Sequence, residues 1–171
     1  GEPAPAAPGS TQTLTVSGLT TGTTYYFAVK TADEIPNWSS ISNVPNGATQ
    51  PAPDATPPAA IANLAITGST VNSISLSWTA PGDDNSTGTA ATYDLRYSTA
   101  AITAANFVSA TPASGEPAPA APGSTQTLTI NGLTAGTTYY FAIKTADEIP
   151  NWSTISNVPN GATPPPPDTT P

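Results

Sequence analysis

The feature that most constrains this chain is an internal repeat. The string GEPAPAAPGSTQTLT begins at Gly1 and again at Gly115, so one repeat is 114 residues long. Residues 1–57 match residues 115–171 at 49 of 57 positions. A fixed period of self-similarity indicates a modular array. We expect further copies beyond these 171 residues, because a half-module alone exposes unpaired strands. The alternative is a split module that another chain completes.

Proline-rich segments mark the joints between the copies. Proline holds the backbone extended, and segments rich in it act as semi-rigid spacers. The sequence therefore predicts the C-terminal half of one module, a linker, a complete module and a linker to a next module, over residues 1–49, 50–60, 61–163 and 164–171.

Between the linkers, apolar and polar residues alternate in short runs separated by turn-forming clusters. In the run SISLSWT, for example, Ile74, Leu76 and Trp78 share one face and serines occupy the other. This period of two is typical of β-strands with one buried face. Strands are predicted over residues 61–66, 73–79, 92–98, 125–131, 138–144 and 153–158. The pattern predicts an all-β, antiparallel β-sandwich, with at most one helical turn, over residues 102–107.

The motifs LSW, YDLRY and GLTAGTTYYFAIKTAD resemble the fibronectin type III family, an immunoglobulin-like sandwich that occurs in tandem repeats. The resemblance covers the complete module, and in the first copy it covers the strands that the family letters E, F and G. It implies that Trp78 lies in the core and that Leu133 and Tyr139 form a tyrosine corner, in which the tyrosine hydroxyl bonds the upstream backbone. Leu19 and Tyr25 occupy the same corner in the first copy.

Composition excludes several classes of function. Only 8% of residues are charged, the net charge is −8 and three residues are basic, so the Lys and Arg clusters that bind nucleic acid are lacking. No apolar run approaches the roughly 20 residues of a membrane helix. Histidine and cysteine are absent, which excludes the usual catalytic triads and zinc sites. Asp83 and Asp84, adjacent on a polar loop, offer a glycosidase neither a cleft nor a raised pKa. We therefore predict no enzymatic activity and no cofactor other than calcium.

Five acidic residues are candidates for that calcium site. The resemblance places the B–C loop, the F–G loop and the start of the module at one end of the sandwich. These segments carry Asp54, Asp83, Asp84, Asp147 and Glu148. Calcium takes six to eight oxygen ligands, so their convergence predicts a calcium ion that stiffens the joint between modules. The alternative is a pair of solvated loop tips, where aspartate favours turns.

The string PNWS occurs in both copies and has two interpretations. Trp38 and Trp152 either anchor contacts with a sugar or a protein, or they cap the core and pack on the proline linker. The same string makes Asn37 and Asn151 glycosylation sequons, and Asn85 begins a third.

The sparse charge and the abundance of hydroxyl side chains favour an extracellular or cell-surface location. We predict a non-catalytic structural repeat of a fibre, stalk or adhesin shaft, whose partners are other copies of itself. One alternative is a spacer or accessory module of a large secreted enzyme. Another is a module that binds a surface polysaccharide or protein through its B–C and F–G loops.

Overall fold

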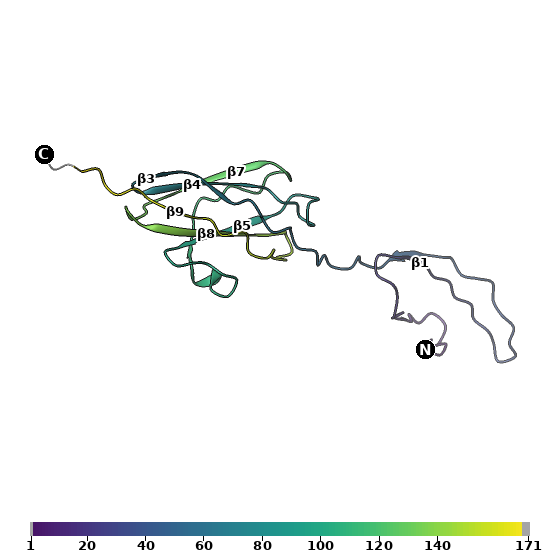
Figure 1. Ribbon diagram of the computed structural model, residues 1–171. Coiled ribbons are helices and arrows are strands. Elements are labelled where there is room, and N and C mark those ends of the chain that lie inside the picture. The colour runs from purple at the N-terminus through teal and green to yellow at the C-terminus, as the bar shows by residue number, and fades with distance from the viewer. Residues whose placement is uncertain (1, 169–171) are drawn as a thin grey trace. The chain divides into compact units, whose positions relative to one another are not determined.

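Two compact units make up the chain. The computed structural model describes residues 2–168, and its contacts separate a first unit, which ends at Pro53, from a second unit, which begins at Asp54. Figure 1 shows the two units as separate parts of the chain that a single connecting segment joins. The first is called unit 1 and the second unit 2 below.

Unit 1 is an open hairpin. Strands β1 (Thr24–Tyr26) and β2 (Asn46–Ala48) pair antiparallel, with Tyr25 opposite Gly47. Beyond β1 the two arms continue as extended chain to an isolated bridge between Ala32 and Trp38. Two strands cannot enclose a core, and the large apolar side chains of this unit are accordingly exposed.

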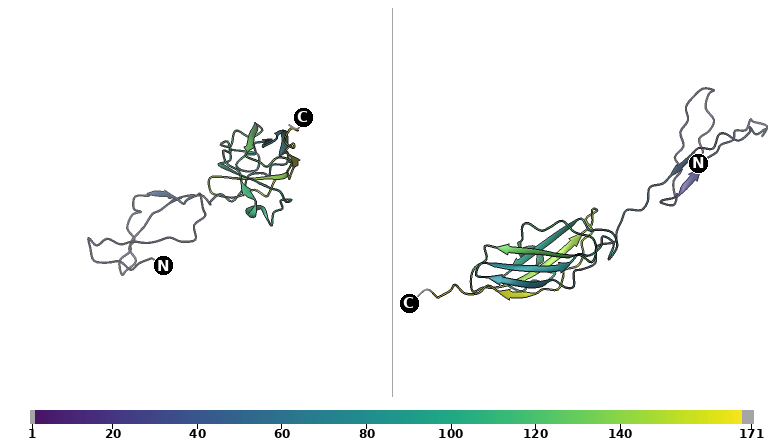
Figure 2. Two further views of the ribbon diagram at one scale, coloured as in Figure 1. Left: turned by 90° about the vertical axis from the view of Figure 1, so that its left-hand side faces the viewer. Right: turned by 90° about the horizontal axis from the view of Figure 1, so that it is seen from above.

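Unit 2 is a closed sandwich of two antiparallel sheets (Figure 2). The first sheet has the order β3-β4-β7, with bounds Ala65–Thr70, Ser73–Thr79 and Thr125–Asn131. The second has the order β6-β5-β8-β9, with bounds Thr111–Pro112, Thr92–Ser98, Thr138–Ala146 and Asn160–Ala162. The antiparallel sandwich and the strands over 73–79, 92–98 and 125–131 are confirmed.

The core of unit 2 lies between these sheets, because the period-two pattern turns one face of β4, β5, β7 and β8 inward. Trp78 is its largest side chain, and its ring meets the Tyr93 ring edge-on at 5.3 Å between centroids. The buried cluster consists of Ile61, Leu64, Ile74, Leu76, Trp78, Tyr93, Leu95, Ile130, Leu133, Tyr139, Phe141 and Ile143.

The first predicted strand is displaced. It was expected over residues 61–66 but begins only at Ala65. Asn157 explains the difference, because its side-chain oxygen accepts from Leu64 N–H at 2.9 Å and its amide donates to Leu64 C=O at 2.8 Å. These bonds tie the backbone of Leu64 to the segment around Asn157, whereas Asn63 bonds β4 through its side chain, at Thr79. Ile61 and Leu64 still enter the core.

The last predicted strand, over residues 153–158, is wrong as a regular strand. The segment runs beside β8, but serine hydroxyls replace backbone carbonyls as acceptors. Ser153 Oγ accepts from Thr145 N–H at 3.0 Å, and Ser156 Oγ accepts from Ile143 N–H at 3.1 Å. Serine side chains compete with the backbone in this way, so the regular ladder resumes only at β9.

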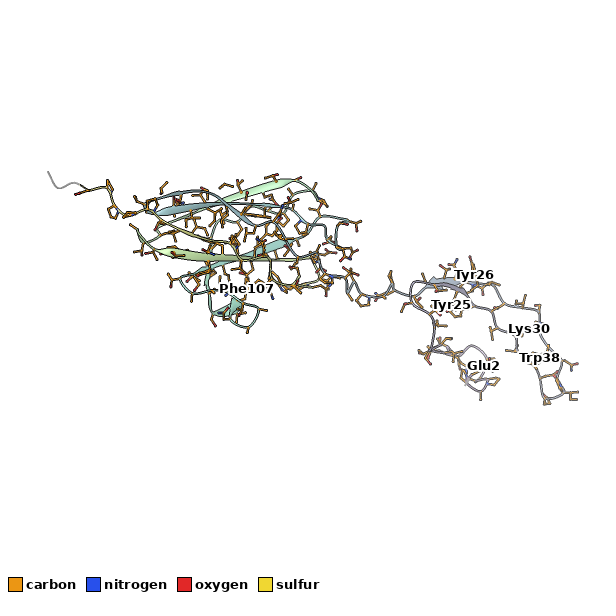
Figure 3. The ribbon with its side chains drawn as sticks, in the orientation of Figure 1. Glu2, Tyr25, Tyr26, Lys30, Trp38 and Phe107 are labelled. Carbon is orange, nitrogen blue, oxygen red and sulfur yellow. The ribbon has the colours of Figure 1, made fainter. Side chains whose placement is uncertain are left out.

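A second small core covers the outer face of the β5–β8 sheet. A single turn of 3-10 helix, Phe107–Ser109, carries Phe107, which Figure 3 labels, and this ring is buried in one cluster with Ala142. The Arg96 guanidinium and the Lys144 ammonium each lie 5.3 Å from the centre of the Phe107 ring, at which distance both cations are attracted to its π-face. Within residues 2–168, no helix has the length and apolar character needed to cross a membrane.

The tyrosine-corner bond that the resemblance implied is present in both units. Thr134 N–H donates to the Tyr139 hydroxyl at 3.0 Å, and Thr20 N–H donates to the Tyr25 hydroxyl at the same distance. Tyr139 is buried, whereas the bond of Tyr25 is open to water.

Removing the hydroxyl of Tyr139 is therefore expected to cost more than removing that of Tyr25. Tyr139→Phe leaves a partly buried N–H without a partner, and we expect a loss of about 1–2 kcal/mol in the free energy of unfolding. For Tyr25→Phe we expect no measurable change, because water replaces the hydroxyl. Urea unfolding of residues 1–171 measures both, and equal losses would contradict this account.

Candidate functional site

Three segments meet at the end of unit 2 where the chain enters it. They are the N-terminal segment 54–60, the B–C loop between β4 and β5, and the F–G loop after β8. Ala59 N–H donates to Asn85 C=O at 3.1 Å, and Asn85 N–H donates to Pro57 C=O at 3.3 Å. The Asn151 side-chain amide donates to Asp54 C=O at 3.3 Å. Both loops are thus tied to the incoming chain.

The B–C loop folds back on itself. Asp83 N–H and Asp84 N–H both donate to Thr87 C=O, at 2.6 and 3.1 Å. Asn85 stands at the tip with a φ of 56°, a left-handed conformation that asparagine tolerates better than most residues. This fold encloses one carboxylate oxygen of Asp83, which is out of contact with solvent and has no hydrogen-bond partner.

The acidic residues at this end of unit 2 together affect the pKa of Asp83. Burial raises its pKa, and the negative charges of Glu148, Asp147, Asp84 and Asp54 raise it further, in that order of effect. The expectation that neither Asp83 nor Asp84 has a raised pKa is therefore wrong for Asp83. The cause is that the loop withdraws one oxygen of this carboxyl from water, while four acidic side chains add the repulsion of like charges.

Asp147 organises the F–G loop. Its side chain is 3% exposed, and its two oxygens accept from the Asn151 backbone and the Asn151 side chain, each at 2.8 Å. Unit 1 repeats the arrangement with Asp33 and Asn37, at 2.9 Å for both bonds. There the hydrogen bonds from Asn37, the side-chain bond most of all, hold the pKa of Asp33 below its usual value. In both copies the aspartate shapes the loop through its own side-chain bonds.

Calcium at this end of the sandwich stays a prediction. Within residues 2–168, no three acidic side chains are arranged so that they could hold a metal ion together. If calcium nevertheless bridges the loops, the thermal midpoint of unit 2 rises on addition of calcium and falls with a chelator. A midpoint that is the same in both conditions would contradict the prediction.

The tryptophans of the PNWS strings are largely exposed. Trp152 is 42% exposed and Trp38 is 65% exposed. The backbone of Trp152 pairs with Ala146, the last residue of β8. The neighbouring sequon residue Asn151 already uses its side-chain amide toward Asp147 and Asp54. Glycosylation of the three sequons stays a prediction.

The charge of Glu148 offers a test of the repulsion around Asp83. A carboxyl with a raised folded-state pKa stabilises the folded state below its unfolded pKa and loses that contribution as the pH rises through the folded value. We expect Glu148→Gln to raise the thermal midpoint of unit 2 near neutral pH, because it removes the largest of the four repulsions. At about pH 3, where carboxyl groups are mostly protonated, we expect no difference.

Glu34→Gln is the matched control, because Glu34 occupies the same position in unit 1 and none of the causes of the Asp83 shift comes from that unit. Thermal melts of both variants at the two pH values, followed by circular dichroism, measure the effect. A gain for Glu148→Gln that persists at low pH would show a cause other than charge.

Comparison with known proteins gives one family match, one related protein and several similar solved structures. The family model described as "Fibronectin type III domain" matches residues 56–158. Chitinase A1 of Niallia circulans is 40% identical over 148 residues, which are 85% of this chain but only 18% of that protein. Among solved structures, a human domain from "fibronectin type III domain containing protein 3" is 19% identical with a TM-score of 0.44, covering 69% of this chain and 98% of that one. A crystal structure of titin domains is 17% identical with a TM-score of 0.45, covering 72% of this chain and 37% of that one.

Proposed function

This chain belongs to the fibronectin type III family, and from that premise we propose that it is a non-catalytic spacer in an extracellular protein that degrades chitin. The observation that carries the spacer role is the placement of the two ends of unit 2. The chain enters beside the F–G loop, where Asn151 bonds Asp54. It leaves at the opposite end of β8, where Gly136 N–H donates to Pro164 C=O at 3.1 Å.

This placement makes each module add its length to the chain. Strand β8 has nine residues, which at about 3.3 Å each span roughly 30 Å. Figures 1 and 2 show the incoming and outgoing chain at opposite ends of the sandwich. The proline-rich segments at both ends resist folding back. A tandem array of such modules would hold the parts on either side of it apart.

The similarity to a chitinase supports the enzyme context. The 148 matched residues exceed one 114-residue repeat, so the similarity extends across a joint between copies. The match is confined to 18% of the relative, as expected if these modules accompany a separate catalytic part. The absence of histidine and cysteine from the sequence agrees with a supporting role.

The test is replacement of residues 61–163 in the full-length protein. One variant receives an equally long Gly/Ser linker, which is a flexible coil. The other receives an unrelated β-sandwich whose termini also lie at opposite ends. For a spacer we expect unchanged hydrolysis of soluble chitin oligosaccharides in both variants. Hydrolysis of insoluble chitin should fall with the flexible linker and be retained with the unrelated sandwich.

Two results would contradict the proposal. Loss of hydrolysis of the soluble oligosaccharides would assign the module to the catalytic machinery. Failure of the unrelated sandwich on insoluble chitin would mean that this module makes specific contacts, and Trp152 would then be the first residue to replace, since it is exposed.

A shaft or fibre on the cell surface is the second candidate. The observation that favours it is the identity of the F–G loop, TADEIPNWS, in both copies, because a repeated contact between modules needs the same surface each time. Electron microscopy of the native material distinguishes the two. Filaments with a regular axial repeat would support the fibre, and separate monodisperse particles would contradict it.

A further inference from the structure

Unit 1 carries an apolar groove of about 600 Å³ along one face of its hairpin. The groove is lined by the side chains that alternate on that face, together with the arm that precedes β1: Leu14, Val16, Leu19, Phe27, Val29 and Pro45. Val29 is 64% exposed and Leu14 is 53% exposed. A contiguous, exposed apolar face typically marks an interaction surface.

Comparison of the two copies of the repeat identifies the segment that would cover this apolar face. The same positions in unit 2 hold Leu133, Phe141 and Ile143, all of which are buried. The side chains that join them in the core, other than those of residues 115–163 themselves, come from one stretch of chain, residues 57–114: Ile61, Leu64, Ile74, Leu76, Trp78, Tyr93 and Leu95. Within the described residues of unit 1, 2–53, no counterpart of this stretch is present.

Two hydrogen bonds across the core of unit 2 have acceptor residues whose counterparts are present in unit 1. In unit 2, Gln126 Oε1 accepts from the Tyr93 hydroxyl, and Glu116 Oε1 accepts from Leu95 N–H at 3.4 Å. Glu2 and Gln12 are the counterparts of Glu116 and Gln126, and Glu2, which Figure 3 labels, lines the groove.

The turn that Gln12 closes is held by the same hydrogen bond as in the complete module. Gln12 Nε2 donates to Ala4 C=O at 2.7 Å, as Gln126 Nε2 donates to Ala118 C=O at 2.8 Å. A conformation preset for its partner loses less entropy on binding.

A count of halves shows that the one stretch 57–114 in each copy of residues 1–171 cannot complete both units. Residues 1–49 and 115–163 are two receiving halves, whereas residues 57–114 are one donating half, already packed within unit 2. Any closed assembly of residues 1–171 alone therefore leaves receiving halves empty. We propose that unit 1 is a docking surface for an additional half-module with the sequence of residues 57–114.

The fit extends to the other face of the hairpin. Residues 102–110 of the donating half cover Ala142 and contact Tyr140 in unit 2, and their counterparts Ala28 and Tyr26 lie uncovered in unit 1, with Tyr26 70% exposed. The differing core residues, Val29 for Ile143 among them, are smaller in unit 1, so the half-module enters without steric conflict. Halves of different copies are therefore interchangeable.

The test supplies the half-module as a separate chain. A tagged segment of residues 57–114 is refolded together with residues 1–171, and the products are analysed by tag capture and native mass spectrometry. We expect a one-to-one complex in which the amide protons of residues 24–30 exchange as slowly as those of residues 138–144. The same segment refolded with residues 115–168, its partners in unit 2, is the positive control for the probe.

Matched variants locate the contact. Val29→Asp in residues 1–171 buries a charge in the proposed interface, and we expect capture to fall by more than about tenfold. Thr24→Asp, on a position exposed in both copies, should leave capture unchanged. Unit 2 is intact in both variants, so loss of folding does not confuse the result.

Three results would overturn the proposal. The first is capture of the segment by residues 115–168 but not by residues 1–171. The second is equal capture in the Val29→Asp and Thr24→Asp variants, which would mean that the segment exchanges into unit 2 instead. The third is dimerisation of residues 1–171 alone that Val29→Asp abolishes, which would make a second unit 1 the occupant.

Discussion

Replacing Phe141 by alanine is expected to destabilise unit 2 by about 3–5 kcal/mol, the usual range for deleting a buried phenylalanine. Phe141 is fully buried between the two sheets and contributes to the main core cluster. Its removal both loses apolar contact and leaves a cavity, because the surrounding strands are held by their ladders and relax only in part. Such a loss is a large part of the stability of a domain of this size.

Phe27→Ala is the matched control, because Phe27 occupies the same position in the first copy, within the same local sequence TTYYFA. Phe27 is 37% exposed, and we expect its replacement to leave the unfolding of unit 2 unchanged. Urea unfolding followed by circular dichroism measures both variants. Similar effects of the two substitutions would contradict the account, since local sequence would then outweigh burial.

Gly82→Ala has the second largest expected effect, because it opens the B–C loop. A Cβ atom at Gly82 would lie 2.3 Å from the backbone nitrogen of Thr87 and 2.4 Å from its carbonyl oxygen. Backbone atoms cannot yield as a flexible side chain does, so the loop must move as a whole. Forcing atoms into a packed site costs about 1–3 kcal/mol, and we expect a loss in this range for unit 2.

Opening the loop should also release the incoming chain. Asn85 is the loop residue that bonds Ala59 and Pro57, and we expect faster amide exchange at Ala59 in the Gly82→Ala variant. Gly68→Ala is the control, because no heavy atom outside its chain neighbours lies within 4 Å of a Cβ there. Slow exchange at Ala59 in the Gly82→Ala variant would mean that the loop absorbs the methyl group locally.

The strands were predictable where hydrophobic alternation decides their position. β4, β5 and β7 lie where the pattern placed them, because a one-residue shift would turn every apolar side chain to the wrong face. The two misplaced strands have a different cause. Asn157 and the serines at 153 and 156 bond the backbone with their side chains, and the alternation pattern contains no information on such bonds.

The sequence predicted which acidic residues lie at the end of unit 2 where the chain enters it, but not that one carboxylate oxygen of Asp83 is enclosed there. The family resemblance brought Asp54, Asp83 and Glu148 to one end from distant parts of the sequence. Burial raises the pKa of Asp83, and the charges of Glu148 and Asp54 are among those that raise it further. The enclosure of its carboxylate oxygen depends on how the loop closes over itself, which the residue types alone do not reveal. The Phe107 core on the outer sheet face was missed because residues 99–110 lack any periodic pattern.

The repeat separates what the sequence determined from what the tertiary structure decided. Sequence alone determined the repeat, the strand alternation, the tyrosine corner and the F–G loop bonds, and these are nearly the same in the two copies because they depend on residues close along the chain. Burial differs completely between the copies, as Phe27 and Phe141 demonstrate. Only the presence of residues 57–114 on the facing side makes the difference, since a core forms between sheets and no single half contains both of its walls.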